Sequence, residues 1–337
     1  MKTLPFVFVA FLSMLPLGAA QAVEPVRIGV LTDMSGGFAE VEGAGAVTAV
    51  RMAVADATDE TDLDVQVQAA DTEGDPDTAV NKAEAFLDDG ADMLIGLAGT
   101  GVAEAVQETV GERAVTIATG AVADDLTNAR CRATAFHWTP NLYVLTQATR
   151  PDLAEPEGTR NIFIYGADRY QALRTTYEDR VMAGGQDVAG QVFVTDIRRV
   201  GQYVTSGMLL FTPFYWNADA ASREWSERFS ARRATPPTYV QAATYSATQH
   251  YLRALAAAGT AALGTVAETM RDMEIDDMYA RNATLRPDGH LQQDMLFMRV
   301  RAAPEMAEAW DYLERLERLS GEEIYQPMAD SRCPRLQ

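Results

Sequence analysis

The alternation of apolar and polar residues is clearest between residues 64 and 102, where it predicts a complete strand–helix–strand unit. Apolar residues alternate with glutamines over 65–69, as in a strand with one buried face. Asp75-Pro76-Asp77 then provides an N-cap, a proline at the first helical position and an acidic first turn, and the helix ends at Gly90. Residues 93–95 form a short buried strand. The whole unit is therefore expected to be a right-handed βαβ crossover.

A turn of small residues, Gly96 to Gly101, leads from this second strand into another helix. It brings a helix N-terminus to the edge of a parallel sheet, where open α/β sheets bind their ligands. The amide hydrogens and the dipole of the helix both point outward there. This turn therefore predicts a place for an anionic ligand group.

Similar patterns extend this sheet. Further strands are predicted at 26–32, 115–118 and 135–139, helices at 43–57 and about 142–149, and a short helical piece from Leu126. Four or five strands alternating with helices predict an α/β domain with a doubly wound parallel sheet over residues 23–150, here called lobe 1.

The proline-rich and acidic stretch 151–158 is expected to be the first crossing into a second lobe, which spans 151–239. This lobe is predicted to have strands at 161–165, 191–196 and 207–212, and helices at about 170–183 and at 220–232. Residues 240–337 are expected to hold hinge-crossing helices at 240–258 and 263–273, a hairpin at 285–291 with 295–300 as its returning strand, and a C-terminal tail, with part of the segment returning to lobe 1. An alanine-rich stripe on the first of these helices is expected to pack against lobe 1.

Residues 1–22 have the features of a secretory signal peptide. Lys2 is the positive end, residues 4–17 are the apolar core, and Ala20-Gln21-Ala22 is the cleavage site. The apolar run is too short to span a membrane, and no cysteine lies near the cleavage site. We therefore expect a protein exported to the periplasm.

The charge of the chain limits its partners. Among 337 residues, 48 are acidic and 28 are Lys or Arg, a formal net charge of −20. Removal of the signal peptide, whose one charge is Lys2, lowers this to −21. Such a charge argues against nucleic acid and anionic membrane surfaces as partners.

The two cysteines, Cys131 and Cys333, are the only ones in the chain. An even number in an oxidising compartment favours a disulfide, which would connect the C-terminal tail to lobe 1. Two unpaired thiols are the alternative. A metal site is disfavoured, because neither cysteine has a Cys or His at ligand spacing.

The sequence contains no pattern typical of catalysis. The three histidines, His137, His250 and His290, are far apart, and there is no nucleophile elbow, phosphate-binding loop or dinucleotide fingerprint. Adjacent acidic pairs such as Asp88-Asp89 do not face each other and are interpreted as solvated surface. We therefore expect no catalytic residue, no metal and no cofactor, and an enzyme is the weaker hypothesis.

From Asp71 through Gly96 the sequence runs as an acid-rich turn, a proline, an Ala-rich helix, an Asp and an apolar strand ending in Gly. This run resembles type I periplasmic binding proteins of the leucine/isoleucine/valine-binding family. The Ser-Gly turn at 35–36 and the WDY…P…CP ending are similar to that family as well. The resemblance implies an α/β fold of two lobes joined by a hinge. After Gly184-Gly185 the family has further strand–helix units that this chain lacks, so the second lobe is predicted to be shortened.

The resemblance also implies a ligand cleft between the lobes. The loops Ala98-Gly99-Thr100 and Gly120-Ala121-Val122 would bind a carboxylate through their backbone amides and the Thr100 hydroxyl. Amino-acid-binding members usually have a hydroxyl residue where this chain has Val122. The second lobe would contribute Asp168, toward an ammonium group or as a simple N-cap, and Tyr170, which would close over the ligand. Tyr215 is a further candidate at the mouth of the cleft, or part of an exposed aromatic turn.

By this resemblance the protein is the solute receptor of an ABC importer of the branched-chain amino acid class. It would bind a small carboxylate or amino acid as a monomer and dock on a permease in the inner membrane. The alternative is an accessory or sensory ligand-binding protein, associated with a periplasmic quinoprotein dehydrogenase system.

Overall fold

The apolar strands of the N-terminal half build a five-stranded parallel sheet. In the computed structural model, which describes residues 25–148, 160–161, 188–190 and 192–337, its strand order is β2-β1-β3-β4-β5. The central strands β3 and β4 are buried along their whole length, as expected where helices cover both faces of a sheet. The strands are β1 (Val26–Thr32), β2 (Val65–Asp71), β3 (Met93–Gly96), β4 (Val115–Ala118) and β5 (Ala135–His137).

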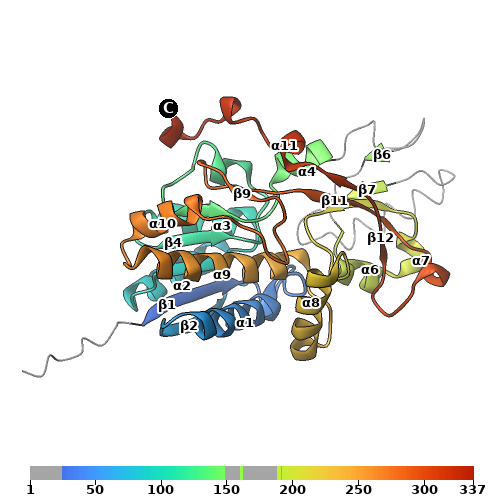
Figure 1. Cartoon of the computed structure of the whole chain (residues 1–337), viewed down its shortest axis with the longest axis horizontal. Coiled ribbons are helices and arrows are strands. Elements are labelled where there is room, and N and C mark those ends of the chain that lie inside the picture. Colours follow the sequence, from blue (N-terminus) through green and yellow to red (C-terminus); the bar gives the residue numbers. More distant parts are fainter. Residues whose placement is uncertain (1–24, 149–159, 162–187, 191) are drawn as a thin grey trace, which may run out of the picture.

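Helices cover the two faces of this sheet in separate layers. The helices α2 (Pro76–Asp88) and α3 (Thr100–Val110) pack on one face, and α1 (Gly43–Glu60) and α9 (Tyr239–Ala258) pack on the other (Figure 1). The predicted cap of α2 is present, since the Asp75 carboxylate accepts a hydrogen bond from the Thr78 amide at 2.7 Å. The predicted doubly wound parallel sheet is thus confirmed.

The second sheet is mixed and gathers segments that are far apart in the sequence. Its order is β12-β11-β8-β7-β6, with β6, β7 and β8 parallel and β11 antiparallel to both β8 and β12 (Figure 1). The strands are β6 (Arg160–Asn161), β7 (Val188–Gly190), β8 (Leu209–Thr212), β11 (Met295–Val300) and β12 (Leu313–Leu319). Beside them lie α6 (Val194–Val200), α7 (Gln202–Thr205) and α8 (Ala220–Arg233). We call this part of the molecule lobe 2.

Two predictions are wrong, one about a strand of lobe 2 and one about the hairpin that follows Leu285. Residues 192–196 are not a strand: helix α6 begins at Val194, and the Asp196 carboxylate accepts the Phe193 amide at 3.0 Å across its first turn. The Asp-Gly hairpin is present, with Gly289 at a φ of +87°. Its returning strand, however, is β10 (Leu291–Gln292), which pairs with β9 (Thr284–Leu285). Strand β11 is buried at five of six positions and instead lies between two strands of the second sheet.

The helices that follow lobe 2 return to lobe 1. Helix α9 packs along α1, and its alanines Ala243, Ala247 and Ala254 are fully buried, as the stripe predicted. Helix α10 (Leu263–Asp272) packs on α9 in turn. No membrane-crossing helix is found among the described residues.

The C-terminal tail lies over lobe 1, where Figure 1 shows the chain ending. The predicted disulfide is present: Cys131 and Cys333 are joined, with their Cα atoms 5.4 Å apart. The Asn128 side chain adds two hydrogen bonds to the same tail, from its Nδ2 to Gln326 and from the Arg332 amide to its Oδ1. The signal peptide and the 151–158 crossing lie outside the described residues.

Candidate functional site

The two loops predicted to bind a carboxylate lie side by side at the carboxyl ends of β3 and β4. The Gly99 amide donates a hydrogen bond to the Gly120 carbonyl at 3.0 Å, and the Thr119 amide donates to the Gly96 carbonyl at 2.8 Å. The sheet order places β3 next to β4, so their carboxyl ends share one edge. We call residues 98–100 and 120–122 the paired loops.

Several backbone N–H groups of the paired loops have no hydrogen-bond acceptor among the described residues. Helix α3 makes its first internal hydrogen bond from the Ala103 amide to the Gly99 carbonyl. The N-cap residue, Gly99, has no side chain to accept from the amides of residues 100–102. The amides of Ala98, Ala121 and Val122 likewise have no acceptor among the described residues. Ala98 and Ala121 are only 1% and 2% exposed, and buried N–H groups are nearly always paired in proteins. The arrangement therefore offers a set of donors without acceptors, which suits an anion.

The glycines of the paired loops are required by the geometry. Gly99 has a φ of +91°, a backbone conformation that other residues rarely adopt. A Cβ atom on Gly120 would lie 2.9 Å from the Ala98 Cα and 2.7 Å from a carboxyl oxygen of Glu42. Gly120 thus allows the two loops and Glu42 to approach closely.

Glu42 is fully buried beneath the paired loops. One of its carboxyl oxygens accepts a hydrogen bond from Thr32 at 2.9 Å, and the other lies 3.5 Å from the Thr119 hydroxyl. Thr119 also contacts Thr244 of α9 at 2.9 Å, so this group connects the loop after β4 to the returning helix. Burial raises the pKa of Glu42 from 4.5 to about 8, so the carboxyl group is protonated at neutral pH. A neutral Glu42 does not repel an anion held above it.

A pair of stacked histidines supports the loop after β4. His137 Nε2 lies 2.9 Å from the Ala121 carbonyl, and because that oxygen only accepts, Nε2 carries the proton. Burial lowers the pKa of His137 to about 4, so the ring is neutral. The His290 ring stacks on it at 5.1 Å, and its Nε2 lies 3.0 Å from the Thr139 carbonyl. The loop is therefore held from below by the hairpin and by β5.

The loop after β1 covers the other side of the site. The buried Asp33 carboxylate accepts hydrogen bonds from the amides of Gly36 at 2.6 Å and Phe38 at 2.9 Å, which closes the loop on itself. The Phe38 ring lies beside Gly99, 3.7 Å from where a Cβ would stand. Phe38 therefore provides an apolar wall next to the donors.

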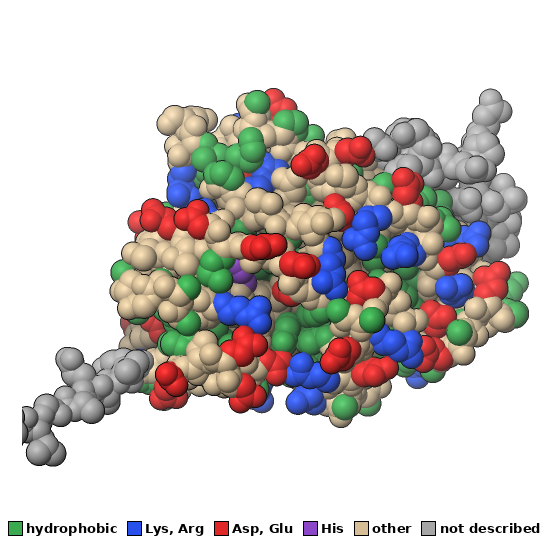
Figure 2. Space-filling model, in the orientation of Figure 1, with side chains coloured by type: hydrophobic (Ala, Val, Ile, Leu, Met, Phe, Trp, Pro, Cys, Tyr) green, Lys and Arg blue, Asp and Glu red, His purple; other side chains and the backbone are tan. Residues whose placement is uncertain are grey.

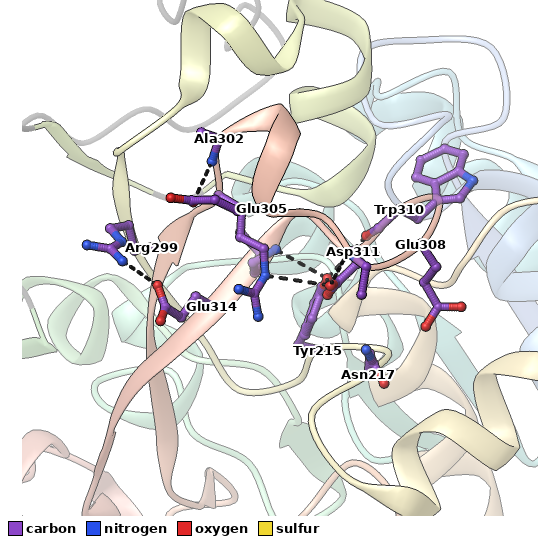
Figure 3. Close-up of polar contacts among 12 residues, drawn as sticks. Tyr215, Asn217, Arg299, Ala302, Glu305, Glu308, Trp310, Asp311 and Glu314 are labelled. Carbon is purple, nitrogen blue, oxygen red and sulfur yellow. Dashed lines mark hydrogen bonds and ion pairs between the residues drawn. The ribbon is translucent and has the colours of Figure 1, made fainter.

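The side chains that were predicted to contact the ligand lie in different environments. Thr100 is exposed at the start of α3, where its hydroxyl is accessible, and Val122 packs against apolar residues of α4 (Leu142–Ala148) and of lobe 2. Asp168 and Tyr170 lie outside the described residues. Tyr215 is 3% exposed, and its hydroxyl donates to the Trp310 carbonyl at 3.1 Å and accepts from the Leu313 amide at 3.3 Å (Figure 3). This hydroxyl is used within lobe 2, so a contact from Tyr215 to a ligand stays a prediction.

Sequence reasoning missed three residues that shape the site: Phe38, Glu42 and His137. Phe38 and Glu42 lie in a loop without periodicity, and the spacing of His137 indicates only that it is not part of a metal-binding motif. The Ser-Gly turn before Phe38 is the one local signal that this loop packs closely against another segment. The roles of all three residues depend on which strands become neighbours in the sheet.

Within the described residues, no three His, Cys, Asp or Glu side chains are grouped closely enough to hold a metal ion. Figure 2 shows acidic and basic side chains interspersed over one face of the molecule. The groups that the site presents are the backbone N–H donors of the paired loops, which suit an anion, beside the apolar ring of Phe38.

Residues 25–195 and 181–305 match the model of the periplasmic binding protein family. The chain belongs to this family. Its fold is that of the type I members, and the family consists of solute-binding proteins of the periplasm. The family membership predicted from the resemblance of the Asp71–Gly96 run is therefore confirmed.

Solved structures agree with this assignment. A periplasmic binding protein from Burkholderia mallei is 28% identical, with a TM-score of 0.82 over 92% of this chain and 98% of that one. A branched chain amino acid ABC transporter periplasmic ligand-binding protein from Burkholderia xenovorans is 25% identical, with a TM-score of 0.83 over 93% and 100%. A branched-chain amino acid transporter substrate binding protein from Streptococcus pneumoniae, solved with isoleucine, is 12% identical with a TM-score of 0.71 over 87% and 99%, which shows the fold alone. The sequence matches no curated protein.

Proposed function

We propose that this periplasmic binding protein is the solute receptor of an ABC importer of the branched-chain amino acid class. It holds a small carboxylate or an amino acid in the cleft between its lobes. The observation that carries the proposal is the set of backbone amides at the paired loops that have no acceptor among the described residues. The family and the transport function named for the Burkholderia xenovorans relative support it.

The chemistry of the paired loops fits a carboxylate. Its two oxygens accept from the amides of Ala98 and Thr100 on one loop and of Ala121 and Val122 on the other, and the Thr100 hydroxyl adds a donor. Glu42 below is neutral, so the ligand meets no like charge there. Phe38 provides apolar contact for the ligand's carbon skeleton.

The second lobe completes the binding site in this proposal. Tyr170 closes over the ligand, and Asp168 pairs with an ammonium group where the ligand has one. Ligand contacts made only in the closed state supply the free energy of closure, so no catalytic step is needed. The closed monomer then docks on an inner-membrane permease. The comparisons give no support to the alternative role beside a dehydrogenase system.

The ligand class is tested by thermal unfolding of the mature protein with amino acids, aromatic acids and short carboxylates. A ligand at a hundred times its Kd adds about 2.7 kcal/mol to the free energy of unfolding. For a protein of this size that raises Tm by a few degrees. A cooperative melt that no compound shifts would contradict the proposal.

The paired loops are tested with Gly120→Ala. Its Cβ would enter space held by Glu42 and the Ala98 backbone, so we expect the affinity for the identified ligand to fall at least tenfold. Gly264→Ala is the matched control, because a Cβ there meets nothing within 4 Å. Thr100→Val, which removes only an exposed hydroxyl, gives a second reading if Gly120→Ala folds poorly. Unchanged affinity in both variants would place the ligand elsewhere.

A further inference from the structure

A cavity lies between the lobes, apart from the paired loops. It has a volume of about 490 Å³, within the usual range for small-molecule sites. Its walls come from the loop after β1, from α6, from the end of α8, from the start of α9 and from the loop between β11 and β12. None of residues 98–100 or 120–122 lines it. The residues that matter below are Glu40, Arg198, Arg199, Arg233 and Trp310.

Trp310 is held at this cavity in an unusual backbone conformation. Its φ is +70°, which is rare for a residue with a bulky side chain. Its carbonyl accepts a hydrogen bond from the Tyr215 hydroxyl at 3.1 Å (Figure 3). It accepts another from the Trp216 indole at 3.0 Å. The neighbouring Asp311 carboxylate accepts the Ala307 amide at 3.3 Å and lies 3.6 Å from Arg301. Such conformations persist where the surroundings impose them, and they gather at ligand sites.

The cavity is positively charged although the chain is strongly acidic. Helices α6 and α8 each have a pair of arginines in the last turn, where the helix dipole favours positive charge. The Arg198 guanidinium lies 4.6 Å from the centre of the Trp310 ring. Neither Arg198 nor Arg233 has a carboxylate partner among the described residues. Arg199 lies 3.7 Å from Glu40, an ion pair that joins α6 to the loop after β1.

We propose that this cavity binds a small organic dicarboxylate. One acid group pairs with Arg198 and the other with Arg233, and the carbon chain packs against the partly exposed indole of Trp310. Guanidinium groups suit this ligand because their planar forks form paired hydrogen bonds with carboxylates. These three residues belong to lobe 2, and Ala39 and Glu40 of the loop after β1 close the cavity from the side of lobe 1.

The test is isothermal titration of the mature protein with succinate, glutarate and adipate at physiological salt. Succinamide, which has the same skeleton without charge, is the ligand control. We expect at least one dicarboxylate to bind and succinamide to show no binding. In the variant Arg198→Gln/Arg233→Gln the affinity should fall at least tenfold. Arg232→Gln should leave it unchanged, because Arg232 lies in the same helical turn and does not line the cavity.

A thermal melt checks that each variant is folded. If the double variant melts early, Arg198→Lys and Arg233→Lys replace it, since they keep the charge and lose the fork, and a several-fold loss is expected from each. The proposal is overturned if no dicarboxylate binds, if these variants bind as well as the wild type, or if Arg232→Gln weakens binding equally.

This proposal does not depend on the function proposed for the paired loops. Thr100→Val should leave dicarboxylate binding unchanged. A dicarboxylate whose affinity falls in Thr100→Val and not in the arginine variants would be bound at the paired loops. That result would overturn the second site and leave the proposed transport function in place.

Discussion

A carboxyl group beneath loops that are proposed to bind an anion must be uncharged if it is not to repel the ligand. Glu42 meets this condition because burial, the largest influence on it, disfavours the ionised form more than the hydrogen bonds from Thr32 and Thr119 favour it. The nearby Asp33 carboxylate acts in the same direction as burial. Glu42 therefore couples the stability of lobe 1 to pH.

The direction of this coupling follows from the two states of the chain. The unfolded chain ionises Glu42 near pH 4.5, and the folded protein keeps it protonated up to about pH 8. Between these values only the unfolded state releases the proton, so the free energy of unfolding falls as the pH rises from 4.5 to 8. Below pH 4.5 Glu42 contributes no such loss.

Glu42→Gln should remove this pH dependence. Glutamine cannot ionise, and it resembles the protonated carboxyl group: its Oε1 accepts from one threonine hydroxyl and its NH2 group donates toward the other. A pKa difference of one corresponds to about 1.4 kcal/mol, so the variant should be more stable than the wild type by several kcal/mol at pH 8 and nearly equal to it at pH 4.5. Denaturant unfolding at a series of pH values measures this. Parallel pH profiles for the two proteins would show that Glu42 is not the responsible group.

Helix α9 is the element that connects the end of lobe 2 to the core of lobe 1. It begins with a capping box, in which Thr238 Oγ accepts the Gln241 amide at 3.2 Å and Gln241 Oε1 accepts the Thr238 amide at 3.0 Å. The Thr238 hydroxyl also donates to the Val41 carbonyl at 2.5 Å. One cap thus secures the helix start and attaches it to the loop after β1.

Thr238→Ala should destabilise the protein by about 1 to 2 kcal/mol, the usual cost of losing such a cap, because both bonds of its hydroxyl are lost. Thr265→Ala, at an exposed position of α10, is the matched control and should change stability by less than about 0.5 kcal/mol. Chemical denaturation of both variants gives the comparison. Equal denaturation midpoints for Thr238→Ala and Thr265→Ala would mean that the cap contributes nothing to the net stability of the fold.

The disulfide acts on the whole molecule. It joins residues 202 positions apart and connects the tail to the loop before β5. In the chain-entropy model a cross-link over a loop of this length stabilises the folded state by about 5 kcal/mol, because it restricts the unfolded chain.

Cys131→Ser/Cys333→Ser should therefore lower the free energy of unfolding by several kcal/mol. The wild type under reducing conditions should behave in the same way, and the variant should no longer respond to reductant. Urea unfolding with and without reductant measures both. If reductant leaves the wild type unchanged, the bond does not restrain the unfolded state.

Much of the fold follows from short-range patterns. The cap at Asp75, the Asp-Gly turn at Gly289 and the buried run of β3 depend on residues a few positions apart, so spacing alone indicates them. The same reasoning places the turn after β3 at the carboxyl edge of the sheet, whereas the loop after β4 was implied by the resemblance to the family. The disulfide was favoured by the number of cysteines and the compartment.

Only the tertiary structure decided which distant segments meet. A buried six-residue strand such as β11 can pair with any two strands that have unpaired edges. Nothing in its local sequence directs it to the sheet of lobe 2 rather than to the hairpin. Glu42 beneath the paired loops, His137 under Ala121 and Trp310 among three arginines bring together residues from separate elements. Their burial and charge depend on packing across the whole chain, and a one-dimensional pattern carries no record of that packing.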